Sequence, residues 1–266
     1  MAIITLTTDF GITDPFVGVM KGVMLSINPS ARFVDITHEI EPQNIKQAVY
    51  VISSSFEYFP AGSIHLCVVD PGVGSERKPL AFEAEGHFFV GPDNGIFTEV
   101  ARKRKPAQIR EITNPAYMLE KISATFHGRD IFAPSAAHLS MGAPLESFGP
   151  RLANLKSMDL PWEMRPSPNL LVGEIIYIDQ FGNAITNLTR ALIEKTAREL
   201  NSSVIKVELE EASVDGILPH YSAAGDEDTL SATFGSWDTL ELFVKNGDAA
   251  LLYGLETETD VRIRFL

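Results

Sequence analysis

Short apolar runs alternate with segments of helical periodicity over the first part of the chain. Residues 2–8 form a β-rich apolar run that ends in polar side chains, which predicts a first strand. The next segment carries one apolar stripe at three- and four-residue steps, formed by Phe16, Val19, Met20, Val23, Met24 and Ile27. This spacing predicts a helix that buries the stripe in the core, with Asp14 as N-cap and Pro15 as first helical residue, ending before Asn28-Pro29.

The same alternation continues toward the middle of the chain. The predicted elements are a strand at 32–37, a helix at about 42–59, a buried strand at 63–70, a hairpin over 80–90 turning at Glu85-Gly86, a helix at about 94–105 and a strand at 108–112. An alternating order of strands and helices is typical of a mostly parallel sheet flanked by helices. We therefore expect an α/β N-terminal domain whose functional side chains lie beyond the carboxyl ends of the strands.

Periodicity is lost between residues 144 and 168, where five prolines occur. This stretch is typical of a linker and predicts a first domain at 1–165 and a second at 166–266. The second domain is predicted to hold a β-rich stretch at 170–188, a helix at 190–200, an acidic surface loop at 212–228 and a last strand at 261–265. We expect a smaller, mostly β, barrel-like domain.

Composition narrows the range of partners. Lysine and arginine number 22 against 35 acidic residues, a net charge of −13, whereas a nucleic-acid binder needs a basic face. No apolar run approaches the roughly 20 residues of a membrane span. The single cysteine, Cys67, cannot form an internal disulfide, and the first residues lack the features of a signal peptide. We expect a cytoplasmic protein that binds neither nucleic acid nor membrane.

Two polar segments of the first half follow predicted strands. In Thr7-Thr8-Asp9-Phe10-Gly11, the carboxylate at the strand end suits a ribose diol, although such an aspartate is also a common turn former. In residues 69–77, a constrained loop with a proline and two glycines separates Asp70 from Arg77. That pair fits either a functional site or an ion pair of a surface hairpin.

Two more polar segments carry candidate chemistry. His127 lies just before a predicted helix N-terminus, where the helix dipole favours anions, or it is a structural histidine. In the second domain, Asp179, Phe181 and Asn183 surround a glycine and offer a carboxylate, an aromatic face and an amide. This combination suits a purine or an amino acid, and a plain β-turn is the alternative.

Together with residues 35–38 (DITH) and 91–95 (GPDNG), these segments match a known family in kind and order. Over nearly its whole length the chain resembles the S-adenosylmethionine (SAM) hydroxide adenosyltransferases, which are related to the fluorinases and chlorinases. The resemblance implies hydrolysis of SAM to adenosine and L-methionine, with water attacking the ribose C5′. It implies no cofactor and no metal, SAM being the substrate.

The resemblance also implies a role for individual residues. Asp70, Arg77 and His127 would surround the attacking water, with either Asp70 or His127 as proton acceptor. The ordinary pKa of histidine, about 6.5, suits a general base better than the 3.9 of aspartate. The implied substrate contacts are Asp9 for the ribose diol, Asp14 for the methionine ammonium, Asp179 and Asn183 for methionine and adenine, Phe126 and Phe181 as walls, and Ser236 and Asn246 on the adenine side.

Three alternative functions stay open at this stage. A halogenase resembles this chain but carries Tyr in place of Asp70, Ser in place of Gly128 and Trp in place of Gln43. A metal-dependent nucleoside hydrolase would use Asp9, Asp70, Asp93 and Asp179 around a hard cation, without a recognisable ligand spacing. A non-catalytic SAM-binding protein would not need the three polar groups around the water.

The resemblance implies an assembly as well. The implied catalytic residues belong to the first domain, whereas Asp179, Asn183 and Ser236 belong to the second. The family resemblance implies a homotrimer in which the first domain of one subunit faces the second domain of its neighbour. We therefore expect sites that are shared between subunits.

Overall fold

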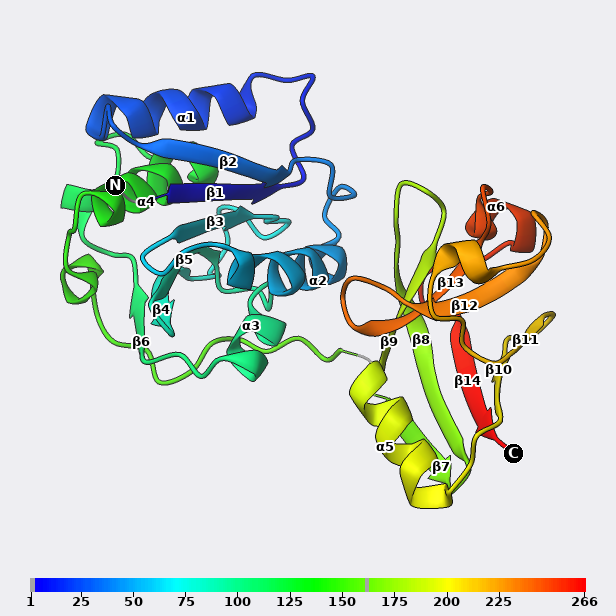
Figure 1. Cartoon of the computed structure of the whole chain (residues 1–266). Helices are drawn as coiled ribbons and strands as arrows, with labels where there is room; N and C mark the ends of the chain where they lie inside the picture. The colour runs from blue at the N-terminus through cyan, green and yellow to red at the C-terminus, as the bar shows by residue number, and fades with distance from the viewer. Residues whose placement is uncertain (1–2, 161–162) are drawn as a thin grey trace. The chain divides into compact units, whose positions relative to one another are not determined.

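The computed structural model describes residues 3–160 and 163–266, and the chain divides into two compact units between Asp159 and Leu160 (Figure 1). The division lies a few residues before the predicted boundary near residue 165. Ala2, in the predicted first strand, and Pro161, in the predicted linker, lie outside the described residues. In the described part of the chain, no helix has the length and apolar character needed to cross a membrane.

Unit 1 is built on a six-stranded sheet with the order β2-β1-β3-β5-β4-β6. Its strands are β1 (Ile3–Thr8), β2 (Arg32–Thr37), β3 (Ile64–Val68), β4 (Pro79–Ala84), β5 (His87–Pro92) and β6 (Gln108–Glu111). The four strands β2, β1, β3 and β5 run parallel, while β4 is antiparallel to both β5 and β6. The sheet is therefore mixed, with its parallel part formed by the predicted βαβαβ alternation.

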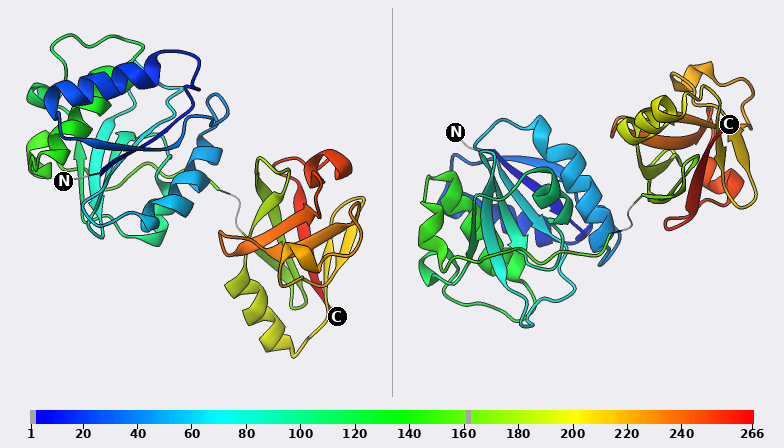
Figure 2. Two further views of the ribbon diagram at one scale, coloured as in Figure 1. Left: turned by 45° about the horizontal axis from the view of Figure 1, so that its top comes forward. Right: turned by 90° about the horizontal axis from the view of Figure 1, so that it is seen from below.

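Helices cover both faces of this sheet (Figure 2). They are α1 (Phe16–Ile27), α2 (Ile45–Ser55), α3 (Thr98–Lys103) and α4 (Ala133–Ser140), with the short 3₁₀ helices η1 (Phe56–Tyr58), η2 (Pro115–Tyr117) and η4 (Leu145–Phe148) and the π-helical segment η3 (Gly128–Phe132), which continues into α4. Helices α1 and α4 pack against each other, as do α2 and α3. Successive side chains of β1 point to opposite faces of the sheet. Ile4 and Leu6 lie on the same face and pack in one core with Met20 and Met24 of α1.

Three helices begin later than their periodicity predicts. Helix α1 begins at Phe16 after Pro15 at the N-cap position, so the prediction of Asp14 as N-cap is wrong. Helix α2 begins at Ile45, because Asn44 caps it by accepting a hydrogen bond from Gln47 N at 2.9 Å. Helix α3 begins at Thr98 because Gly95, with φ of 100°, lies outside the helical region.

Unit 2 is an antiparallel, nearly closed, barrel-like sheet with the order β11-β10-β14-β8-β9-β13-β12 and β7 paired to β8. Its strands are β7 (Met164–Ser167), β8 (Leu170–Ile178), β9 (Ala184–Thr189), β10 (Ile205–Glu208), β11 (Ser213–Asp215), β12 (Leu230–Phe234), β13 (Thr239–Val244) and β14 (Asp260–Phe265). A bridge between Leu218 and Thr233 draws the segment after β11 onto the far edge strand β12. This bridge nearly closes the barrel.

Two helices and one short turn complete unit 2: α5 (Arg190–Leu200), α6 (Ala249–Tyr253) and η5 (Tyr221–Ala223). Helix α5 has the predicted bounds because Thr189 caps its start and Asn201, in the left-handed conformation, ends it. The prediction of a plain loop at 212–228 is wrong. This stretch contains β11, which completes a pairing with β10, and the turn η5.

Candidate functional site

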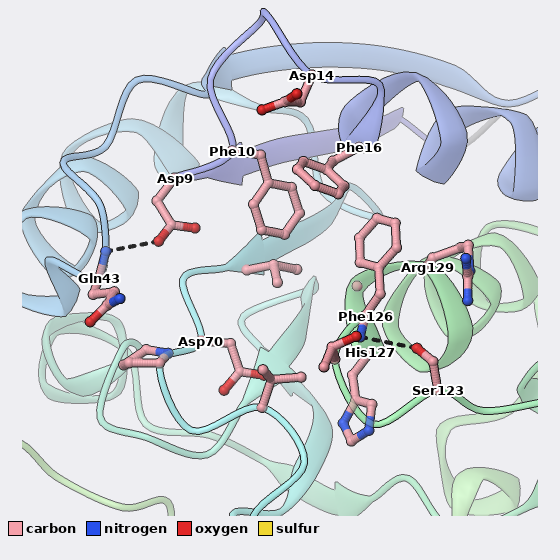
Figure 3. Close-up of a pocket in the computed structure, with 15 residues that line it drawn as sticks. Asp9, Phe10, Asp14, Phe16, Gln43, Asp70, Ser123, Phe126, His127 and Arg129 are labelled. Atoms are coloured by element: carbon pink, nitrogen blue, oxygen red, sulfur yellow. Dashed lines mark hydrogen bonds between the residues drawn. The ribbon is translucent and has the colours of Figure 1, made fainter.

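A pocket of about 740 Å³ opens beyond the carboxyl ends of β1 and β3 in unit 1 (Figure 3). Asp9 reaches it from the end of β1, and Asp70 from the segment after β3. Phe126 and His127 line the opposite part, just before η3. Asp14 lines the pocket as well. The pocket thus contains five of the residues predicted to form the site: Asp9, Asp14, Asp70, Phe126 and His127.

Arg77 joins the two polar groups that flank the lower part of this pocket. Its Nε donates to both carboxylate oxygens of Asp70 at 2.9 Å, and its Nη2 donates to Asp70 Oδ2 as well. The same Nη2 lies 2.8 Å from His127 Nδ1. The Arg77 side chain is only 8% exposed and is not part of the pocket lining. Arg77 therefore holds Asp70 and His127 together from behind.

The hydrogen-bonding capacity of arginine fixes the tautomer of His127. A guanidinium donates and cannot accept, so His127 Nδ1 must accept the hydrogen bond from Arg77. Burial lowers the pKa of His127, and the charge of Arg77 lowers it further. His127 is thus a neutral imidazole whose proton is on Nε2.

The loop between Asp70 and Arg77, residues 70–77, packs tightly against the loop of residues 123–130. Gly74 has φ of 78°, a conformation that favours glycine. A side chain at this position would also run into the backbone carbonyl of Ala124. The close approach of the two loops explains how Arg77 reaches His127, which is fifty residues away in sequence.

Asp130 holds the 123–130 loop in place. Its side chain is fully buried and accepts hydrogen bonds from Ser123 N at 2.8 Å, Ser123 Oγ at 2.7 Å and Arg129 Nε at 2.6 Å. Burial alone would raise the pKa of Asp130, but the hydrogen bonds from Arg129 and Ser123 outweigh it and lower that pKa. Phe126 and His127 are therefore presented by a braced loop.

The upper part of the pocket combines carboxylates with an aromatic wall. Asp9 Oδ2 accepts a hydrogen bond from Gln43 N at 2.9 Å. The rings of Phe10, Phe16 and Phe126 contact one another, with centroids 5.3–5.9 Å apart. Figure 3 shows these rings between Asp14 and His127. Such a pocket suits a ligand with both an apolar and a cationic part.

The predicted burial of the whole α1 stripe is wrong for Val19, which is 39% exposed, and for Phe16. The Phe16 side chain is 41% exposed and lines the pocket, whereas Met20 and Met24 of the same stripe are fully buried. Phe10 was likewise missed as a site residue, although it lies in the segment that carries Asp9. Periodicity could not reveal Phe16 as a site residue, because the spacing of apolar residues does not distinguish a side chain of the core from one that lines a pocket.

The candidate residues of the second unit line a separate pocket of about 1050 Å³ within that unit. The predicted residues in its lining are Asp179, Phe181, Asn183, Ser236 and Asn246. The turn interpretation of residues 178–183 also holds, because Asp179 accepts hydrogen bonds from Phe181 N, Asn183 N and Asn183 Nδ2. The turn leaves the Phe181 ring exposed at the pocket.

Sequence reasoning missed a buried acid in this second pocket. Glu241 on β13 is 3% exposed and accepts a hydrogen bond from Tyr221 Oη at 2.6 Å. Burial raises the pKa of Glu241, and the nearby charge of Asp179 raises it further. Trp237 stacks obliquely on Tyr177 at 5.3 Å in the same lining. Only the fold could identify these residues, because they lie on different strands and turns.

The four aspartates considered for a metal site are each engaged elsewhere. Asp9 binds Gln43 N, Asp70 binds Arg77, and Asp93 accepts from Lys156 N at 2.7 Å, while Asp179 belongs to the turn of unit 2. Within residues 3–160 and 163–266, no three histidine, cysteine or acidic side chains gather as a metal-holding group.

Comparison with known proteins identifies the family. A model of the SAM hydroxide adenosyltransferase N-terminal domain matches residues 4–149, and a model of the C-terminal domain matches residues 173–262. The chain belongs to the SAM hydroxide adenosyltransferase family. The resemblance stated from the sequence motifs is thereby confirmed.

Individual members of the family match most of the chain. An (R)-S-adenosyl-L-methionine hydrolase of Thermus thermophilus is 36% identical over 96% of this chain and 97% of its own length. One of Salinispora arenicola is 37% identical over 84% and 87%, and a fluorinase of Nocardia brasiliensis is 27% identical over 98% and 96%. An uncharacterized conserved protein from Thermotoga maritima has a similar structure, with a TM-score of 0.91, 36% identity and coverage of 98% and 99%.

Proposed function

We propose that this protein hydrolyses SAM to adenosine and L-methionine by in-line attack of water at the ribose C5′. The observation that carries the proposal is the Asp70–Arg77–His127 arrangement at the wall of the unit 1 pocket. Family members at 36–40% identity are named (R)-S-adenosyl-L-methionine hydrolase, which supports the same conclusion.

The main task of the protein in this reaction is to hold the water, the ribose C5′ and the sulfur in line. An oxygen–C5′ bond forms while the C5′–sulfur bond breaks, the sulfur leaves as the neutral thioether of methionine, and the water gives up one proton. Such a leaving group needs no Lewis acid, so the proposal includes neither a metal nor a cofactor. Because positive charge on sulfur is neutralised in the transition state, exclusion of bulk water favours the reaction.

We assign the water contacts to Asp70 and His127. The Asp70 carboxylate accepts a hydrogen bond from the water and takes up its proton, while His127 Nε2–H donates to the water oxygen. His127 suits the donor role because Nδ1 already accepts from Arg77 and because its pKa is lowered. Arg77 is the positioning residue of the pair. We thus propose Asp70, rather than His127, as the proton acceptor.

Substrate contacts follow the two pockets. We propose that Asp9 binds the ribose diol and Asp14 the methionine ammonium, with Phe126 as a wall. The proposed contacts of unit 2 are Asp179, Phe181, Asn183, Ser236 and Asn246, which line one pocket of that unit. In this proposal the functional protein is a cytoplasmic homotrimer, and unit 1 of one subunit and unit 2 of its neighbour complete each site.

Two features of unit 1 favour hydrolysis over halogenation. The Asp70 carboxylate would repel a halide ion. A Cβ atom on Gly128, where a halogenase carries serine, would lie 3.2 Å from the Phe126 ring and 3.3 Å from Met20 Sδ. The space around Gly128 is thus already filled by the aromatic wall.

The decisive experiment incubates the purified protein with SAM in ¹⁸O-labelled water and separates the products by chromatography with mass detection. Adenosine with label in its 5′-hydroxyl, together with unlabelled methionine, is the expected result. Adenosine without label, after exchange has been excluded, contradicts direct attack by water. Absence of both products contradicts the hydrolase function itself.

A further inference from the structure

The segment Gly91–Gly95 (GPDNG) has no part in the proposed substrate contacts, yet it adjoins the 70–77 loop. It begins within the last residues of β5 and leads into α3. Gly91 permits a close approach to β3, because a side chain there would collide with the carbonyl of Cys67 and lie 3.0 Å from the Phe97 ring. The 91–95 loop is thus packed directly beside the strand that delivers Asp70.

Two hydrogen bonds fasten the 91–95 loop to both ends of the 70–77 loop. Asn94 Nδ2 donates to the carbonyl of Val69, the residue immediately before Asp70, at 2.8 Å. The backbone N–H of Asp93 donates to the carbonyl of Lys78, the residue immediately after Arg77, at 2.8 Å. The backbone that carries Asp70 and Arg77 is therefore clamped on either side.

The clamp is itself rigid. Asn94 Oδ1 accepts from Ile96 N at 3.2 Å, which orients the amide so that its NH₂ group faces Val69. On the far side, Asp93 Oδ1 accepts from Lys156 N at 2.7 Å. The 91–95 loop is thus held from two directions and acts as a fixed support.

We infer that Asn94 is a positioning residue for the reaction, acting through the backbone of Val69 on Asp70 and, through Arg77, on His127. The inference rests on the proposed function, because hydrolysis is the reaction whose geometry it sets. Asn94 is not part of the pocket lining, so its effect reaches turnover by way of the 70–77 loop. Catalytic geometry tolerates little movement, since a displacement of about 1 Å can reduce the rate about 100-fold.

Unit 1 offers a matched control at Asn114. Its Nδ2 donates to the carbonyl of Ser147 at 2.8 Å and its Oδ1 accepts from Ala116 N at 3.0 Å, so it makes the same two kinds of bond as Asn94. Both side chains are half-buried, but the partner of Asn114 is remote in sequence from the 70–77 loop. Replacement by serine keeps a local turn in each case and removes the reach to the distant carbonyl.

The experiment compares Asn94→Ser with Asn114→Ser in Tm, kcat and KM for SAM. We expect similar losses of Tm, a fall in kcat of about 10–100-fold for Asn94→Ser with KM changed by less than about threefold, and kcat within about twofold of the original for Asn114→Ser. Equal losses of kcat in the two variants would overturn the inference. If the serine variants do not fold, Asn94→Asp and Asn114→Asp make the same comparison, with an acceptor in place of the NH₂ donor.

A second readout separates this inference from the proposed function. The charge of Arg77 contributes to the low pKa of His127, so a displaced 70–77 loop should move that pKa upward in an NMR titration of Asn94→Ser but not of Asn114→Ser. No turnover is needed for this measurement. Lack of hydrolysis by the unaltered protein would refute the function, whereas an unchanged His127 pKa in Asn94→Ser would refute the positioning role.

Discussion

Arg77 determines the chemistry of its neighbours through the fixed geometry of its guanidinium. Its planar fork satisfies both oxygens of Asp70 and still reaches His127 Nδ1. A lysine could not make these contacts together, because its ammonium is a single point of charge. One buried cation thus sets the orientation of a carboxylate and the tautomer of an imidazole.

Asp70→Asn and His127→Ala should each lower kcat by about two to four orders of magnitude while KM changes little, because both residues are assigned to the water. Asp9→Ala should instead chiefly raise KM, because Asp9 is assigned to the ribose. Steady-state kinetics of the three variants separates the two classes. Near-normal turnover of Asp70→Asn would show that this carboxylate does not handle the nucleophile.

His65 makes the stability of unit 1 sensitive to acid. Burial, together with the neighbouring His87, lowers its pKa from 6.5 to about 3, and its ring bonds Thr5 Oγ1 at 2.9 Å. Between these pH values the unfolded chain binds a proton that the folded chain does not. The free energy of unfolding therefore falls as pH drops from about 6.5 toward 3, by up to about 1.4 kcal/mol per pH unit from this group.

Urea unfolding at about pH 7 and pH 5 tests this dependence in the unaltered protein and in His65→Gln. The variant should lose less stability between the two conditions. Carboxylates also titrate in this range, and they cancel in the comparison. The exposed His220 supplies the control, since His220→Gln should leave the pH dependence unchanged. Identical dependence in His65→Gln and the unaltered protein would contradict the role of His65.

At the scale of elements, two loops and the start of one helix form the unit 1 site around a sheet edge. The 70–77 loop follows β3, the 123–130 loop includes the first residues of η3, and Phe16 at the start of α1 lines the same pocket. Asp130 supplies the internal bracing of the second loop, since the hydrogen bonds from Ser123 close it into a fixed turn. The geometry of His127 thus depends on a residue that does not line the pocket.

Asp130→Ala should lower the free energy of unfolding by about 1–3 kcal/mol, because the N–H and hydroxyl of Ser123 lose their buried acceptor. It should also reduce kcat, since the loop that carries Phe126 and His127 is loosened. Asp260→Ala is the control, because Asp260 makes an exposed ion pair with Arg262 and should change neither quantity noticeably. Chemical unfolding and steady-state kinetics on both variants provide the measurement. If Asp130→Ala is destabilised but keeps full activity, the bracing of this loop is not required for catalysis and the prediction is wrong.

The pattern of apolar positions predicts the buried parts of strands and helices well, and the starts of helices less well. β2 and α5 have the predicted bounds, since their alternation and capping signals are local. The starts of α1, α2 and α3 differ because loop residues such as Gln43, with φ of 67°, leave the helical conformation for reasons set by their surroundings. Asp70, Arg77 and His127 were candidates from sequence, but the bond between Arg77 and His127 required two loops to meet.

At the scale of the whole molecule, each unit carries a pocket lined by residues that the family resemblance associates with one substrate. The pocket of unit 1 contains the Asp70 and His127 pair, and that of unit 2 the Asp179 turn with Glu241. Carboxylates are prominent in both linings, which suits a substrate that carries a sulfonium and an ammonium group.

Hydrolysis should not depend on a divalent metal. The sulfonium leaving group needs no Lewis acid, and the four candidate aspartates are engaged by other groups. The rate should be unchanged after exhaustive treatment with EDTA and removal of the chelator. A loss of activity that Mg²⁺ or Ca²⁺ restores would favour a metal-dependent hydrolase.

Sharing of sites between subunits predicts complementation between two inactive variants. Asp70→Asn damages unit 1 and leaves unit 2 intact, while Asn183→Ala does the reverse. If each site combines unit 1 of one chain with unit 2 of its neighbour, chains mixed randomly in equal amounts give intact pairs at about one site in four. About a quarter of the original activity should therefore appear after the two variants are unfolded together and refolded.

The control for this experiment refolds each variant alone and adds the two activities, and mass spectrometry of the intact assemblies establishes that both chains are present in one oligomer. A site formed within one chain predicts no gain, because every chain then carries one damaged half. Mixed oligomers whose activity equals the sum of the separate variants would therefore contradict shared sites. Activity that rises in proportion to the product of the two chain fractions would instead support sites shared between neighbouring chains, because each intact site then requires one chain of each kind.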